Sequence, residues 1–282
     1  MMKQIKQAPF VLAAIFFVLM ACSSVANTPA APTQPKVIEA TATQPAVVEA
    51  TLTAAASATP EQVVEVTFKT PEEAITHYFE GVAQNNVGKI LQACAINEMG
   101  EKFKLDVYVA RLGNVMYPSQ SLSPSDYPFY AEMNEMAVSS QILGQVRFLA
   151  YGLLSSEKVD DGSLITNMDP DRVNKFIQDV DPRKLSTIEI QKISPPNQTL
   201  MNDPKYIANA VKRAAVYGAE DSTERVALFS FEQNDYYIGF TLLRYGEDWK
   251  ISSQSSPLAN TDVLGAPVKI SVDDFEGMIN SQ

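Results

Sequence analysis

Cysteine, histidine and tryptophan are scarce in this chain of 282 residues, which contains two cysteines, one histidine and one tryptophan. A catalytic triad or a histidine-rich metal site needs histidine at defined places, and His77 is the sole candidate. No Cys-x-x-Cys, His-Glu-x-x-His or phosphate-binding glycine loop occurs. We therefore assign no catalytic residue, no metal and no cofactor. His77 is expected at the surface or boundary of a helix.

The chain also has fewer basic than acidic residues. The chain has 22 Lys and Arg against 33 Asp and Glu, and residues 1–21 hold two of these bases, Lys3 and Lys6, and no acid. A chain without residues 1–21 keeps 20 bases and a net charge of −13. Such a protein repels phosphate backbones and anionic lipid headgroups. We expect no nucleic-acid partner, and surface charge does not explain any attachment to a membrane.

The first 21 residues have the pattern of a secretory signal. Lys3 and Lys6 precede an apolar run, Ala8–Ala21, which is shorter than the about 20 residues of a membrane-spanning helix. The run ends in Leu19-Met20-Ala21-Cys22, which resembles the lipobox of bacterial lipoproteins. Residues 1–21 are therefore expected to be a lipoprotein signal peptide, with Cys22 as the site of lipid attachment.

In the lipoprotein family the cysteine thiol receives a diacylglyceryl group, a dedicated peptidase cuts before the cysteine, and in many bacteria the new amine is acylated too, for example with palmitate. The resemblance implies a chain anchored by lipid at the extracytoplasmic face of the cell membrane or the outer membrane. Ordinary secretion is the alternative. Ser24-Val25-Ala26 is an acceptable cleavage site, and a cut after Ala26 would discard Cys22.

Residues 22–64 are rich in Ala, Thr and Pro and contain a ten-residue repeat, Gln34–Thr43 followed by Gln44–Thr53. The segment has no aromatic residue and few charges, a composition that cannot bury enough surface to offset chain entropy. We expect a disordered tether. The only other cysteine, Cys94, lies in an apolar helical pattern and is expected to be a buried, inert thiol.

Residues 65–258 predict one α+β domain. Thr70-Pro71-Glu72-Glu73 is a capping box that starts a helix, and a second short helix is expected over Val87–Ala95. Residues 100–185 are expected to be mostly helical, and the longest helix is expected over Tyr127–Leu154. The residues expected to share its buried face are Phe129, Met133, Met136, Ala137, Ser140, Leu143 and Tyr151, with Ile142, Val146 and Leu149 widening that face. A partner-binding groove is the other interpretation of this face.

The last third changes to short β-branched and aromatic runs. A helix beginning at Asp203-Pro204 is expected to turn Ile207 and Val211 inward along with its other apolar residues. The strands are expected at Thr187–Ile193, Arg225–Glu232, Tyr236–Tyr245 and Trp249–Ser253. The last three are separated by turn signals and predict an antiparallel meander, with helices packed on one face of the sheet. Residues 259–282 are expected to be a C-terminal tail with one short helix.

Two segments resemble the nuclear transport factor 2-like superfamily, also called cystatin-like. "TPEEAITHYFEGVAQNN" within Thr70–Ala95 is similar to the opening helical pair, and "FTLLRYGEDWKISS" within Ser222–Ser253 is similar to the closing hairpin. The resemblance implies a cone-shaped pocket between helices and sheet. It also implies that residues of about 100–182 are a large helical insertion, because the family core is shorter than this domain. The residues proposed to line the pocket are Tyr78, Phe229, Tyr236 and Trp249. They can equally form the core.

Three functions follow as hypotheses. The first is a lipid-anchored binding or accessory module, whose partner is an envelope protein or a small apolar ligand. The second is an enzyme of the isomerase or hydratase type, which needs a carboxylate and a tyrosine in one concave pocket. The third is a structural envelope protein, which solvent-exposed Met133, Met136 or Leu143 would favour.

Overall fold

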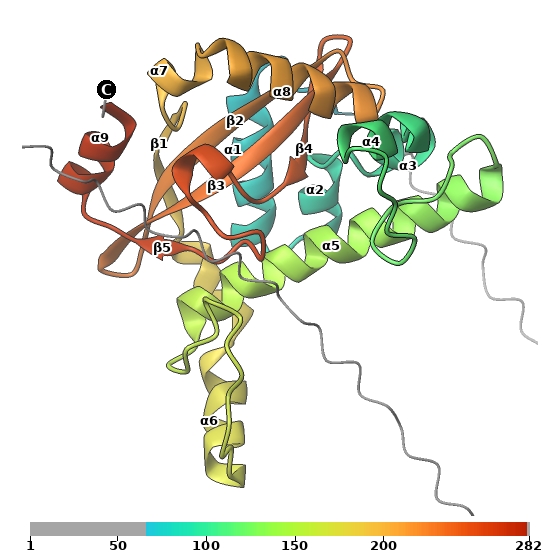
Figure 1. The fold of residues 1–282 in the computed structure, drawn as a ribbon. Helices are drawn as coiled ribbons and strands as arrows, with labels where there is room; N and C mark the ends of the chain where they lie inside the picture. The colour runs from blue at the N-terminus through green and yellow to red at the C-terminus, as the bar shows by residue number, and fades with distance from the viewer. Residues whose placement is uncertain (1–65, 281–282) are drawn as a thin grey trace, which may run out of the picture. The chain divides into compact units, whose positions relative to one another are not determined.

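The computed structural model describes residues 66–280. The expected signal peptide, the tether and the lipid-attachment residue Cys22 lie outside this part of the chain. The described chain is an α+β protein, which confirms the predicted fold class (Figure 1). Among the helices of residues 66–280, none combines the length and the hydrophobicity needed to cross a bilayer.

Helices and strands follow the expected order. The helices are α1 (Pro71–Ala83), α2 (Val87–Gln92), α3 (Ile96–Lys102), α4 (Leu105–Arg111), α5 (Pro128–Leu154), α6 (Pro170–Asp179), α7 (Gln198–Met201), α8 (Pro204–Val216) and α9 (Val272–Asn280), with 3-10 turns η1 (Pro182–Thr187) and η2 (Pro257–Ala259). The strands are β1 (Glu189–Ser194), β2 (Asp221–Phe231), β3 (Asn234–Tyr245), β4 (Asp248–Ser253) and β5 (Val268–Lys269).

Local signals set the main boundaries. Thr70 accepts a hydrogen bond from the N–H of Glu73 at 3.2 Å and Pro71 is the first residue of α1, as the capping box predicts. Asn86 caps α2 in the same way, through the N–H of Lys89 at 3.0 Å. These caps fix the two opening helices directly from the sequence.

The sheet is antiparallel in the order β1-β2-β3-β4, and β5 pairs with the start of β3. The expected meander of β2, β3 and β4 is confirmed, with Ala227 opposite Ile238 and Thr241 opposite Ser253. Tight turns join these strands, and Glu232 and Gly246 take positive φ values of 54° and 63° there. Gly246 suits this conformation because it has no Cβ.

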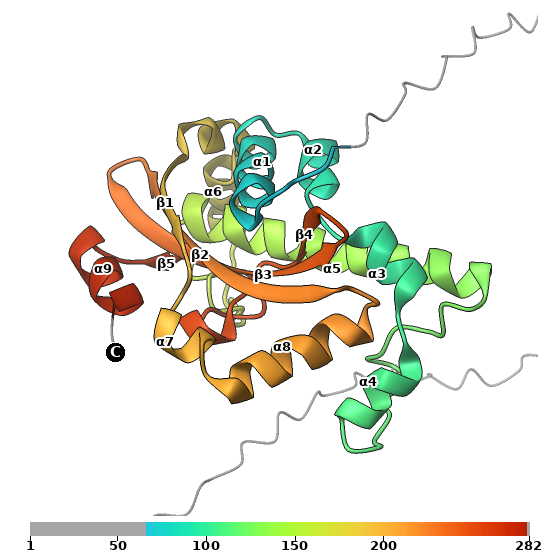
Figure 2. The same ribbon diagram turned by 90° about the horizontal axis from the view of Figure 1, so that it is seen from above.

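Both faces of the sheet are covered, which corrects the expectation of helices on one face (Figure 2). Side chains alternate along a strand, so Ala227, Phe229 and Phe231 of β2 join the core under α1 and α5. Val226 and Leu228 point the other way, into a second cluster around Phe275 of α9. Helix α8 lies on that second face, because Arg213 reaches Ser222 of β2.

The buried face of α5 agrees with the expected one only at Ile142 and Leu149. Its buried residues are Ala131, Asn134, Val138, Ile142, Gln145, Leu149 and Leu153. Phe129, Met133 and Met136 are instead 68%, 47% and 64% exposed, and Leu143 is half-buried. The prediction for α8 was also wrong in part. Ile207 and Val211 are exposed, whereas Ala210 and Ala214 are buried.

Candidate functional site

A groove of about 850 Å³ lies between α2, α3 and the middle of α5, and we call it the α3–α5 groove. Its residues are Val66, Gly88, Leu91, Gln92, Cys94, Ile96, Asn97, Glu98, Glu135, Met136, Ser139, Ser140, Leu143, Arg147 and Lys250. Aliphatic side chains alternate with charged and hydroxyl groups along it. This mixture suits a binding site, in which apolar area gives affinity and a few polar groups give orientation.

Close packing of α3 on α5 forms one end of the groove. A Cβ on Gly100 would lie 2.4 Å from Cγ of Glu135 and 3.1 Å from the carbonyl oxygen of Ala131, so only glycine allows this approach. Asn134, which is 2% exposed, donates to the carbonyls of Gly100 at 3.3 Å and Ser123 at 2.9 Å. The N–H of Ser123 donates back to Asn134 at 2.8 Å. Buried amides satisfied in this way fix neighbouring segments.

The floor of the groove is tied to β4. The backbone N–H of Ala95 donates to the carbonyl of Ile251, and the N–H of Ile251 donates to the carbonyl of Ala93, both at 2.8 Å. Cys94 lies between these bonds as a buried free thiol, as expected, and its Sγ donates to the carbonyl of Ile90 at 3.3 Å. Burial raises the pKa of the Cys94 thiol, so the thiolate that would act as a nucleophile is disfavoured.

Lys250 is the buried cation of the floor. Its side chain is 9% exposed, and Nζ donates to the carbonyls of Val66 at 3.1 Å and Gln92 at 3.0 Å. Nζ also lies 3.3 Å from Asp248 and 5.0 Å from the centre of the Phe68 ring. The cation is thus held by three oxygens and an aromatic face, which positions it rigidly.

The charges are distributed unevenly along the groove. Glu98 lies on α3, and Glu135 is the first of the groove residues along α5. Arg147 lies about three turns further along α5. Burial raises the pKa of Glu98, with Lys250 acting in the opposite direction. Burial also raises the pKa of Glu135, and the nearby carboxylates Glu101 and Glu132 add to this effect. One end of the groove is therefore acidic.

The aromatic residues proposed as a pocket lining do not surround a common cavity. Tyr78 and Phe229 are 1% and 0% exposed and belong to the core, where the Tyr78 hydroxyl donates to Gln254. Tyr236 is half-buried and stacks on Phe229, with ring centres 5.9 Å apart. Trp249 is half-buried near Arg244, in shallow hollows away from the α3–α5 groove. Tyr78 and Phe229 thus follow the alternative expectation, in which these aromatic residues form the core.

His77 lies half-buried on α1, as expected for a boundary histidine. Its Nε2 is 3.3 Å from Oε1 of Gln92, and its ring packs on Phe68 with centres 4.9 Å apart. Within residues 66–280, no three His, Cys, Asp or Glu side chains are arranged so that they could hold a metal ion.

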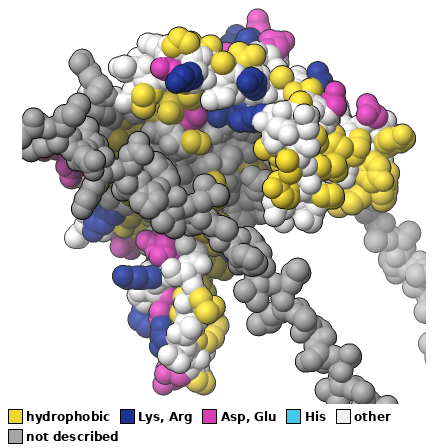
Figure 3. All heavy atoms as spheres, in the orientation of Figure 1, with side chains coloured by type: hydrophobic (Ala, Val, Ile, Leu, Met, Phe, Trp, Pro, Cys, Tyr) yellow, Lys and Arg dark blue, Asp and Glu magenta, His cyan; other side chains and the backbone are white. Residues whose placement is uncertain are grey.

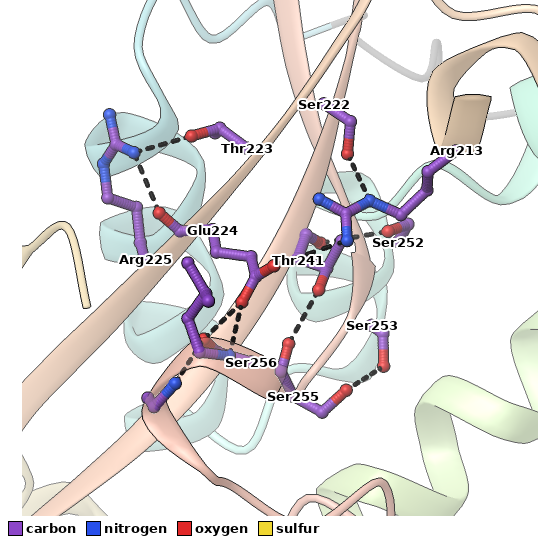
Figure 4. A network of polar contacts seen from close by, with 12 residues as sticks. Arg213, Ser222, Thr223, Glu224, Arg225, Thr241, Ser252, Ser253, Ser255 and Ser256 are labelled. Atoms are coloured by element: carbon purple, nitrogen blue, oxygen red, sulfur yellow. Dashed lines mark hydrogen bonds and ion pairs between the residues drawn. The ribbon is translucent and has the colours of Figure 1, made fainter. Parts of the chain in front are cut away.

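A second polar cluster lies on the opposite face of the sheet (Figure 4). Glu224 is 1% exposed and accepts hydrogen bonds from Ser256 Oγ at 2.6 Å and from the N–H of Leu258 at 3.1 Å. Arg213 of α8 approaches it at 3.4 Å and donates to Ser222 at 2.6 Å. Burial, followed by the charge of Glu224, raises the pKa of Tyr206 to about 12. The hydrogen bonds and the ion pair of Glu224 hold η2 and α8 on the sheet. We therefore assign this cluster a structural role.

Met136, Ser140 and Leu143, which the sequence offered as part of a partner-binding groove, do line the α3–α5 groove. The other walls were missed because they come from segments far apart in the chain. Leu91, Glu98, Leu143 and Lys250 share no local pattern. The one available signal was the excess of apolar residues on α5, which covers more of the helix circumference than one buried face requires.

No family model matches the sequence, and no curated protein matches it. Among solved structures, the chain is similar to a cystatin-like protein from Ruminococcus gnavus ATCC 29149, with a TM-score of 0.49 and 17% sequence identity. The match covers 71% of this chain and 44% of that chain, so this chain spans less than half the length of its neighbour. The protein is an α+β protein with a structural neighbour among the cystatin-like proteins, at low identity.

Proposed function

We propose that this protein is a lipid-anchored, extracytoplasmic binding module. In this proposal Cys22 carries the lipid, residues 22–64 are a spacer, and the α3–α5 groove is the binding surface. The observation that carries the binding role is the open groove of about 850 Å³, whose lining combines aliphatic, charged and hydroxyl side chains. The lipobox-like Leu19-Met20-Ala21-Cys22 carries the anchor, since two or three acyl chains hold a protein stably on a bilayer.

The isomerase or hydratase alternative receives less support. Such an enzyme would need a tyrosine and a carboxylate in one open cone, but Tyr78 and Phe229 are core residues. A structural role in the envelope is a second candidate, and the exposure of Met133 and Met136 favours it because both side chains are available to a partner. The binding role and the structural role use neighbouring parts of α5, and Met136 belongs to both.

Labelling with a radioactive fatty acid tests the anchor. The wild-type protein should incorporate label and remain in the membrane fraction after washing with high salt, whereas Cys22→Ala should incorporate none. Cys94→Ala is the matched control and should keep the label. An unlabelled wild-type protein that begins at Asn27 would instead establish ordinary secretion and end the anchor proposal.

Photo-crosslinking from single positions tests the binding surface. A benzophenone side chain at Ser140, which is an exposed groove residue, should give discrete covalent products in intact cells. The same side chain at Glu247, in the exposed β3–β4 turn, should give none. Equal products from both positions, or none from Ser140, would contradict a binding role for the groove.

A further inference from the structure

The first turns of α5 expose an unusual group of large apolar side chains, which we call the α5 apolar surface. Its members are Tyr127, Phe129, Tyr130, Met133 and Met136, which are 61%, 68%, 37%, 47% and 64% exposed. The ring of Tyr130 contacts those of Tyr127 and Phe129, with centres 5.9 and 5.5 Å apart. Figure 3 shows hydrophobic side chains gathered over this end of the molecule. Single exposed apolar residues are common, but a contiguous group of this kind marks an interaction surface.

Carboxylates border this surface. Glu101, Asp126, Glu132 and Glu135 line a hollow of about 330 Å³ beside Pro128. None of the four forms an ion pair with any residue of the described chain. The sequence has no lysine or arginine between Arg111 and Arg147. The acidic border therefore lacks its counter-charges.

The negative charge of this border distinguishes between the possible binding partners of the α5 apolar surface. An anionic membrane surface would be repelled by these carboxylates, although the apolar side chains alone would suit a bilayer. A second copy of the chain would bring the same acidic border, and like charges that face each other across an interface are costly. A partner with apolar residues flanked by lysine or arginine satisfies both the apolar side chains and the carboxylates.

The shape favours a helix as the occupant. Phe129, Met133 and Met136 follow one another at helical spacing along the exposed side of α5, with the acidic hollow beside them. An apolar row of this kind on a helix suits an amphipathic helix, which lays its own apolar face on the receptor. We propose that the α5 apolar surface and its acidic border dock a lysine- or arginine-rich amphipathic helix of a partner protein. This inference rests on the proposed binding role and is independent of the lipid anchor.

Fluorescence anisotropy with designed peptides tests the proposal. The full chain is used in phosphatidylcholine nanodiscs if it is lipid-bound, with empty nanodiscs as the blank, or in buffer if it is not. The probes are an 18-residue amphipathic helix of leucine and lysine, the same helix with glutamate in place of lysine, and a scrambled leucine–lysine peptide without an apolar face. The first probe should bind at least 10-fold more tightly than the other two, and its affinity should fall with added salt.

Two double variants locate the binding. Met133→Ser with Met136→Ser, and separately Glu132→Lys with Glu135→Lys, should each weaken binding of the basic helix at least 10-fold. Ile207→Ser with Val211→Ser, on the exposed side of α8, is the matched control and should bind as wild type does. Unchanged thermal melting of each variant shows that the fold is retained.

Several results would overturn the proposal. Equal binding of the acidic or scrambled peptide, or wild-type affinity in both α5 variants, would remove the basic helix as occupant. A concentration-dependent dimer in sedimentation that Met133→Ser with Met136→Ser abolishes would assign the surface to a second copy. Fatty-acid labelling reports on the anchor separately, so its failure and that of peptide docking are distinguishable.

Discussion

Gln145 and Gln254 are joined by two reciprocal hydrogen bonds. The side-chain oxygen of Gln145 accepts from the backbone N–H of Gln254 at 2.9 Å, and the side-chain amide of Gln254 donates to the backbone carbonyl of Gln145 at 3.2 Å. Both residues are at most 3% exposed. The pair fixes the middle of α5 to the segment after β4, and thereby holds one wall of the α3–α5 groove against the sheet.

Replacing Gln145 should destabilise the protein. Gln145→Met keeps the volume but leaves the N–H of Gln254 and the carbonyl of Val263 without their partner, which should lower the free energy of unfolding by about 2 kcal/mol. Urea denaturation measures this loss. Gln141→Met, one turn earlier on the exposed side of α5, should change stability by less than about 0.5 kcal/mol. Equal effects at both sites would contradict the importance of the pair.

Helices α3 and α5 offer a matched pair of glycines, Gly100 and Gly144. Gly100→Ala should cost about 1–3 kcal/mol, because the new Cβ meets Glu135 and the backbone of Ala131 in the contact between α3 and α5. Gly144→Ala should instead stabilise the protein by about 0.5–1 kcal/mol, since a Cβ there meets nothing within 4 Å and alanine favours the helix. Thermal or chemical denaturation would reveal opposite signs. Stabilisation by Gly100→Ala would show that α3 does not pack this tightly.

The ion pair of the buried Glu224 should contribute more to the free energy of unfolding than an ion pair of an exposed carboxylate. Arg213→Met removes a cation from a pair in which Glu224 is 1% exposed, and should lower the free energy of unfolding by about 3 kcal/mol. Arg244→Met, which breaks a contact with the exposed Glu220, should cost less than about 1 kcal/mol. Circular dichroism during denaturation gives both values. A loss at Arg213 no larger than that at Arg244 would contradict a buried structural pair.

Glu98 should make stability depend on pH. Burial raises its pKa above the ordinary 4.5, so between these values the folded state binds more protons than the unfolded state. Its contribution to stability is therefore greatest at low pH and falls as pH rises through the window from 4.5 to the raised pKa. Glu98→Gln removes this dependence, so the variant should gain in melting temperature relative to wild type more at pH 7.5 than at pH 4.

A second variant controls for the loss of a carboxylate at an exposed position. Glu247→Gln lies in an exposed turn and should follow the wild-type melting curve at both pH values. If the difference between Glu98→Gln and wild type did not change with pH, the Glu98 carboxyl would not be the group responsible.

The parts of the fold that depend on local chemistry could be predicted. The start of α1 at Thr70 and the meander of β2, β3 and β4 each carry a cap, a turn or a β-branched run. These signals act over a few residues, so they are visible in one sequence. The α+β class followed from them.

The buried face of α5 could not be predicted in this way. Its inward positions include Asn134 and Gln145, which are buried because they bond to Ser123, Gly100 and Ser253 elsewhere in the chain. A reading based on hydrophobicity assigns such amides to the surface and turns the helix so that methionines point inward. The candidate groove depends on the same long-range contacts, and this is why its residues outside α5 could not be predicted from the sequence.

The described chain begins beside the groove, where three hydrogen bonds secure it. The carbonyl of Val66 accepts from Lys250, the N–H of Phe68 donates to Asp248 at 2.7 Å, and the carbonyl of Phe68 accepts from Trp249 at 2.8 Å. A pull transmitted from the residues ahead of Val66 would be taken up first by these bonds. Because Val66 and Lys250 also line the groove, mechanical tension at the leading end of the domain would act directly on the groove that we propose as a binding surface.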